Sequence, residues 1–171
     1  MGGPGSGNVW NRPGKRSTVE DSLVVSVWDF QKRLYAGAAG AITWTWTSGG
    51  SSTIGYFVTE TDDDDLAVTL YYRWRGTEDV IEPVRMQTTP TQFGGSRWWF
   101  TCPLVVGGNA CNRRAGKLYL SPGSRYFGCR QCHKLTYRSC QESHQMERAC
   151  RRLGYSPEEA REFAKRPGSF R

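Results

Sequence analysis

The chain has 171 residues, with 23 Lys and Arg against 16 Asp and Glu and a formal net charge of +7. This length suffices for one domain of ordinary size or two small ones. No apolar run approaches the ~20 residues of a membrane span, and the start of the chain has no apolar stretch typical of a secretory signal. The composition argues against a membrane protein, and we expect a cytoplasmic protein with reduced thiols.

The first 18 residues are rich in Gly, Asn, Pro and basic side chains. They offer too little apolar surface to offset the entropy of ordering, so we expect a flexible arm over 1–18. Two interpretations stay open for it, plain disorder or a basic arm that lies along a nucleic-acid backbone. Residues 22–35 then predict a short strand followed by a helix, with Ser26 as N-cap and Asp29 at the third helical position.

Four runs alternate apolar and polar residues with the period of a half-buried strand, at 42–46, 54–58, 66–74 and 80–89. The short turns between them predict an antiparallel meander with one buried aromatic face. Pro83 inside the fourth run indicates a sheet edge or a bulge, because proline has no N–H for a strand partner. The aromatic residues suit a sheet core, with a stacking platform for single-stranded bases as the alternative.

The second half of the chain predicts smaller elements. A strand over 97–101 leads into Cys102, and 117–120 with 125–128 read as a hairpin. An apolar stripe ending at Gly154, followed by a capping pattern at 156–159, predicts helices near the C-terminus. The expected fold class is mainly β (α+β). We expect a short helix and antiparallel sheet over 19–93, a zinc ribbon over 94–140 and a helical segment over 141–171.

Cysteine spacing gives the clearest chemical signal. Cys129 and Cys132 form a two-residue-spaced pair directly after a predicted strand, the arrangement of a zinc knuckle. A tetrahedral site needs two more soft ligands, and Cys102 and Cys111 lie after another strand and in a glycine-containing loop. We therefore predict one structural Zn²⁺ held by these four cysteines. The eight residues between Cys102 and Cys111 exceed the usual two to four.

Other uses of the cysteines and histidines stay open. A redox role for the Cys129–Cys132 pair requires a thioredoxin-like context that an all-β surrounding does not supply, and a disulfide framework requires export. His133 is an alternative ligand, and Cys140 with His144 are candidates for half of a second site. Cys150 falls on the apolar stripe and suits buried packing. We expect no enzyme, because four thiolates close the coordination sphere and no catalytic motif is evident.

Positive charge is concentrated in the second half of the chain. From Cys102 onward there are fourteen Lys and Arg against five acidic residues, whereas the preceding part has nine against eleven. The basic residues nearest the cysteines are candidates for phosphate contacts: Arg113, Arg114, Lys117, Arg130 and Lys134. A solvated basic face is the plainer alternative.

Several segments resemble an uncharacterised family of small bacterial zinc-ribbon proteins. They are the glycine-rich start 1–7, 18–21, 93–103, 113–120, and 129–132 with Leu135, Tyr137 and Ser139 after it. The resemblance implies the same four cysteine ligands. The loop between Cys102 and Cys111 is longer in this chain than is usual for the family. The family has no assigned activity, so the resemblance adds little about function.

Two functions compete at this point. The first is a nucleic-acid-binding accessory factor with structural zinc, DNA or RNA being unresolved. The alternative is a protein–protein interaction adaptor or inhibitor acting on a larger complex, with the aromatic sheet and Trp98–Trp99 as interface anchors.

Overall fold

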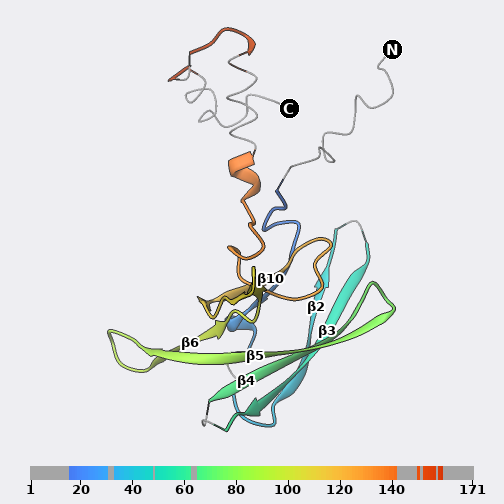
Figure 1. The fold of residues 1–171 in the computed structure, drawn as a ribbon, viewed down its shortest axis with the longest axis vertical. Helices are drawn as coiled ribbons and strands as arrows, with labels where there is room; N and C mark the ends of the chain where they lie inside the picture. Colours follow the sequence, from blue (N-terminus) through green and yellow to red (C-terminus); the bar gives the residue numbers. More distant parts are fainter. Residues whose placement is uncertain are drawn as a thin grey trace.

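The computed structural model describes residues 16–30, 33–47, 49–62, 65–141, 150, 152–156 and 158–159. Within these residues the protein is mainly β, as predicted, and a strongly curved antiparallel sheet dominates it (Figure 1). Six strands follow one another across this sheet: β2 (Ala39–Thr45), β3 (Ser51–Glu60), β4 (Leu66–Trp74), β5 (Glu78–Pro90), β6 (Ser96–Thr101) and β9 (Arg114–Ala115).

The four alternating runs of the sequence form β2 to β5, and consecutive strands are neighbours, which confirms the meander. Ile54, Tyr56 and Val58 of β3 face the core, while Phe57 between them is exposed. On this outer face the Tyr71 ring lies over Gly55, so that a Cβ at Gly55 would collide with it. The alternation of the sequence therefore places one row of side chains in the core and the other in solvent.

Pro83 lies in a strand that is central in the sheet order but locally has one partner. Strand β5 pairs with β4 through residues 78–85 and with β6 through residues 86–90. Pro83 stands opposite Thr69 of β4, at a level where β6 does not reach. The predicted sheet edge is thus present as a local edge within a central strand. No second strand lies beside Pro83 at this level, so its missing N–H costs no hydrogen bond to such a strand.

A second, two-stranded sheet joins the first strand to a segment in the second half of the chain. Strand β1 (Leu23–Ser26) pairs antiparallel with β10 (Lys117–Leu120). The predicted helix after β1 is one turn of 3₁₀ helix, η1 (Val27–Phe30). Its expected cap is confirmed, because Ser26 N–H donates to Asp29 Oδ2 at 2.8 Å and Trp28 N–H to Ser26 Oγ at 3.3 Å.

The hydrophobic core draws on every part of this arrangement. Phe30 of η1 is fully buried between Tyr56 and Phe100, with ring centroids 4.7 and 5.9 Å away. Leu118 of β10 and Phe127 belong to the same buried cluster as the inner side chains of β3, β4 and β5. Core residues thus come from both sides of the boundary at 93/94, and the β5–β6 hairpin runs across it.

Contacts between distant segments continue outside the sheets. Thr18, the last residue of the predicted arm, is buried and forms a bridge with Thr136, while residues 1–15 lie outside the described residues. Of the predicted helical segment 141–171, few residues are described; Gly154 has φ +84°, and Ser156 and Glu159 exchange the two predicted capping bonds of 2.8 and 3.3 Å. No helix among the described residues has the length and apolar character to cross a membrane.

Candidate metal centre

Cys102 is positioned by the end of the main sheet. It follows β6 directly, and its N–H donates to Arg113 O at 2.9 Å, continuing the pairing of β6 with β9. Its side chain is fully buried. The sheet therefore fixes both the backbone and the burial of the first sulfur.

A small hairpin explains the wide spacing between Cys102 and Cys111. Strands β7 (Val105–Val106) and β8 (Asn109–Ala110) pair with each other. Gly107 and Gly108 between them have φ +60° and +82°, which a tight two-residue hairpin turn requires and glycine readily adopts. Cys111 N–H then donates to Leu104 O at 2.9 Å, so the chain returns beside the residue at which the hairpin began. When the hairpin residues 105–110 are left out, only Pro103 and Leu104 separate Cys102 from Cys111. This is the two-residue spacing of a zinc knuckle.

The second cysteine pair sits on a turn that β10 holds. Tyr119 and Gly128 exchange two backbone hydrogen bonds of 2.8 and 3.0 Å, which is the shortened form of the predicted hairpin 117–128. Directly after Gly128, His133 N–H donates to Cys129 O at 3.3 Å and closes the turn. A Cβ at Gly128 would collide with Leu104, so the two cysteine loops pack against each other at this glycine.

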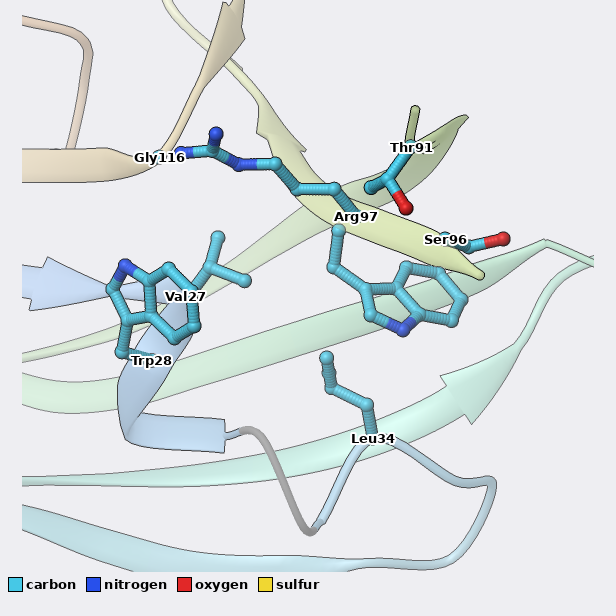
Figure 2. A pocket seen from close by; sticks show the side chains of 8 residues that line it. Val27, Trp28, Leu34, Thr91, Ser96, Arg97 and Gly116 are labelled. Atoms are coloured by element: carbon cyan, nitrogen blue, oxygen red, sulfur yellow. The ribbon is translucent and has the colours of Figure 1, made fainter. Parts of the chain in front are cut away.

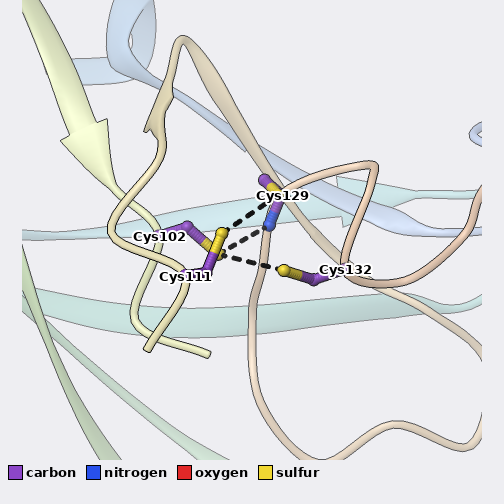
Figure 3. A group of neighbouring side chains, drawn as sticks. All are labelled: Cys102, Cys111, Cys129 and Cys132. Atoms are coloured by element: carbon purple, nitrogen blue, oxygen red, sulfur yellow. Dashed lines mark hydrogen bonds between the residues drawn. The ribbon is translucent and has the colours of Figure 1, made fainter. Parts of the chain in front are cut away.

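The four predicted cysteines converge on one point (Figure 3). Their sulfurs all lie within 4.8 Å of one another. The Sγ–Sγ distance is 3.9 Å between Cys102 and Cys132 and also 3.9 Å between Cys111 and Cys129. Four sulfurs at ~2.3 Å from a tetrahedral zinc ion stand ~3.8 Å apart, whereas a disulfide requires ~2.05 Å. All six cysteines are free. The sulfur geometry therefore fits one tetrahedral metal ion.

The pKa values of the clustered thiols indicate that four thiolates need a nearby cation. Burial raises the pKa of Cys102 to about 11, although a Cys129 N–H donates to its sulfur at 3.2 Å, and burial also raises the pKa of Cys132 above the usual range of a thiol. Burial opposes ionisation of Cys129 too, but N–H donors from Cys132 and Gln131, with neighbouring thiols, lower its pKa to about 7. One thiolate is stabilised without metal, and four adjacent thiolates need a divalent cation to offset their repulsion.

The other candidate ligands are not part of the cluster. His133 is half-buried near Ser124, with Nδ1 3.4 Å from the hydroxyl, and burial lowers its pKa. Cys140 is exposed and Cys150 is buried, as its place on the apolar stripe predicts, while His144 lies outside the described residues. Among the described residues, these four cysteines are the one group of three or more His, Cys, Asp or Glu side chains whose ligand atoms lie close enough together to hold a metal ion.

All five basic residues predicted to contact phosphates are exposed: Arg113, Arg114, Lys117, Arg130 and Lys134. Arg130 lies over the Tyr137 ring at 5.2 Å. Two other arginines of this region are in ion pairs, Arg125 with Glu78 and Arg138 with Asp21. Within the described ranges, none of the five predicted residues forms an ion pair.

Comparison with protein-family models, curated proteins and solved structures found no significant match for this chain.

Proposed function

We propose that this protein is a zinc-ribbon protein with one structural Zn²⁺ and that it acts as a nucleic-acid-binding accessory factor. The observation that carries the proposal is the convergence of the Cys102, Cys111, Cys129 and Cys132 sulfurs within 4.8 Å of one another. Thiolates select soft or borderline metals, and four of them leave no open position for water or substrate. The metal is therefore structural, and we assign the protein no enzymatic role. A site of reduced thiols suits the cytoplasm.

The zinc part is tested by metal content in matched cysteine variants. Cys132→Ser removes a ligand, while Cys140→Ser removes an exposed thiol outside the cluster. We expect one zinc per chain by elemental analysis in the wild type and in Cys140→Ser, and loss of zinc with unfolding of the sheet and the cysteine region together in Cys132→Ser. Structural zinc contributes on the order of 10 kcal/mol to folding in small modules, so the contrast is large. Wild-type protein purified without chelator and free of zinc would refute this part.

The nucleic-acid part is supported by where the basic side chains attach. Arg113 and Lys134 each come two residues after a cysteine of the cluster, and Arg130 lies between Cys129 and Cys132. A metal that fixes the cysteines also fixes these backbones, which lowers the entropy lost when the side chains bind phosphate. Their exposure without ion pairs leaves them available for an acidic partner.

Salt dependence tests the phosphate contacts. Each contact to duplex DNA lowers log affinity by ~0.9 per unit of log salt concentration, so Arg113→Ala with Arg114→Ala should reduce the slope by ~1.8. The pair Arg73→Ala with Arg75→Ala makes the same charge change at the β4–β5 turn and should leave the slope unchanged. Zinc content is measured in both variants. Zinc-loaded wild type that binds neither duplex DNA, single strands nor RNA at low salt would reject nucleic-acid binding.

The outer face of the sheet favours a second candidate, a protein-interaction adaptor. Phe57, Tyr71 and Ile81 are 42%, 49% and 73% exposed on adjacent strands. Gly55 and Ile81 both stand opposite Tyr71, and Phe57 is two residues from Gly55, so the three side chains are close neighbours. Recovery of tagged protein from cells with and without nuclease treatment separates the candidates, because a protein partner that survives nuclease favours the adaptor.

A further inference from the structure

A hollow of about 600 Å³ lies between η1, the start of β6 and the segment that joins β9 to β10 (Figure 2). Its apolar lining includes Val27, Trp28, Leu34 and Trp98, and Gly116 forms part of the wall. Hydroxyl groups of Thr91 and Ser96 stand at another side of it. This volume is in the usual range for small-ligand sites, ~300–1,000 Å³.

Trp28 lines this hollow with its indole ring and does not pack against the hydrophobic core. The side chain is 61% exposed and is not among the residues packed on the hydrophobic core. The backbone beneath it is held on both sides, because Val27 N–H donates to Gly116 O at 3.0 Å and Trp28 N–H to Ser26 Oγ at 3.3 Å. The fold thus holds in place an aromatic surface that is free to stack on a ligand.

The rim of the hollow is positive. Arg97 lines it, with its guanidinium 4.2 Å above the Trp99 ring, and Figure 2 shows this side chain extending toward Gly116. Gly116 itself precedes the exposed Lys117 in the chain, and the exposed Asp29 follows Trp28. Among the described residues that line the hollow, Arg97 carries the charge and none is a carboxylate. The site combines a flat apolar wall with cationic groups, which suits an uncharged aromatic ring that carries an anionic group.

We propose that this hollow binds an unpaired base of a single-stranded nucleic acid, stacked on Trp28, with Arg97 contacting the adjoining phosphate. A base inside a duplex is already stacked on its neighbours, so a single strand supplies the free ring. Thr91 and Ser96 line another side of the hollow, and the Thr91 hydroxyl donates to Gly94 O. This inference rests on the nucleic-acid part of the proposed function and names the kind of strand that is bound.

The test compares two single strands of equal charge. Oligonucleotides of about 12 nucleotides, a length within the range of single-strand sites, carry either thymine at every position or no base at all. Binding to zinc-loaded full-length protein is followed by fluorescence anisotropy at fixed salt. Stacking of one base strengthens affinity by about 5- to 150-fold, so the wild type should prefer the thymine strand by this factor.

Trp28→Ala should abolish this preference and leave affinity for the baseless strand unchanged, while Trp28→Phe restores part of the preference. Trp46→Ala is the matched control, because Trp46 is 47% exposed, lies just after β2 and does not line the hollow. Zinc content confirms that each variant keeps its fold.

The outcomes separate the two proposals. If neither strand binds the wild type, nucleic-acid binding itself is rejected, and this inference with it. If both strands bind equally, nucleic-acid binding stands and base capture is overturned. A preference that survives in Trp28→Ala, or that Trp46→Ala removes to the same extent, likewise overturns the assignment to this hollow.

Discussion

Glu82 should make the protein less stable as pH rises from acidic to neutral. This side chain is 5% exposed, and its Oε2 accepts a 2.9 Å hydrogen bond from Phe127 N–H and lies 3.0 Å from the Tyr72 hydroxyl. The Tyr72 hydroxyl is also 2.6 Å from Arg125 O, which can only accept a proton. The Tyr72 hydroxyl has a single proton, so its donation is shared between Glu82 Oε2 and Arg125 O and gives a carboxylate at Glu82 only partial support.

Burial raises the pKa of Glu82 from 4.5 to about 7, against the opposing bonds from Phe127 and Tyr72. Between these values the unfolded chain has lost the proton and the folded protein keeps it, so the free energy of unfolding falls as pH rises and levels off above the folded pKa. From about pH 5 to about pH 8 the linkage amounts to about 2.5 kcal/mol.

The assay is urea unfolding of wild type and Glu82→Gln at both pH values with zinc bound. Zinc affinity also depends on pH, but the two proteins share the same cysteines, so the difference between them isolates Glu82. We expect this difference to shift by about 2.5 kcal/mol in favour of Glu82→Gln on going to the higher pH. A difference that stays constant with pH would show that Glu82 is ionised in the folded protein and would refute the reasoning.

Three further predictions concern the cysteine loop, the outer face and the shared core. A variant that lacks residues 105–110, and so reads Cys-Pro-Leu-Cys, should still bind one zinc per chain by elemental analysis. Loss of the metal would mean that the β7–β8 hairpin is needed to hold Cys111 at the site. Gly55→Ala should lower the free energy of unfolding by about 1–3 kcal/mol because its Cβ collides with the Tyr71 ring, and by clearly less when Tyr71→Ala is already present. Chelation of zinc should unfold the sheet and the cysteine region in one transition by circular dichroism, since Phe127 shares the core of the meander; sheet signal that outlasts the metal would mean two separate cores.

Local periodicity was enough to predict the meander, because each of its strands is long enough to show alternation. The β7–β8 hairpin was too short for this: its strands were not predicted, and Cys111 was placed in a glycine-containing loop. Its signal was the Gly107-Gly108 pair between two-residue strands. The pairing of β1 with β10 was not predictable, since alternation shows that a strand forms but not which distant strand it meets.

The convergence of the four cysteines could be predicted because their chemistry and spacing are carried by the sequence itself. The surroundings of the cluster could not, since the N–H donors to the sulfurs depend on turn geometry. Glu82 was also missed, although a lone acid at the inward position between Val80 and Val84 is a visible signal. The hollow beside Trp28 depends on η1 meeting β6, a tertiary contact that no local pattern specifies.

The pairing of β1 with β10 sets an order for folding on the ribosome. Leu23 meets Leu120, and Thr18 meets Thr136, so the first strand waits while roughly 90 further residues are made, about 5–20 s at ordinary rates of synthesis. During this time the apolar side of β1 has no partner strand, and Phe30 lacks part of its cover. In the proposed zinc site, the metal fixes the turn that follows the partner of β10 at Gly128. On this proposal, a cell short of zinc would leave β1 and η1 open to chaperones and proteases, far along the chain from the cysteines themselves.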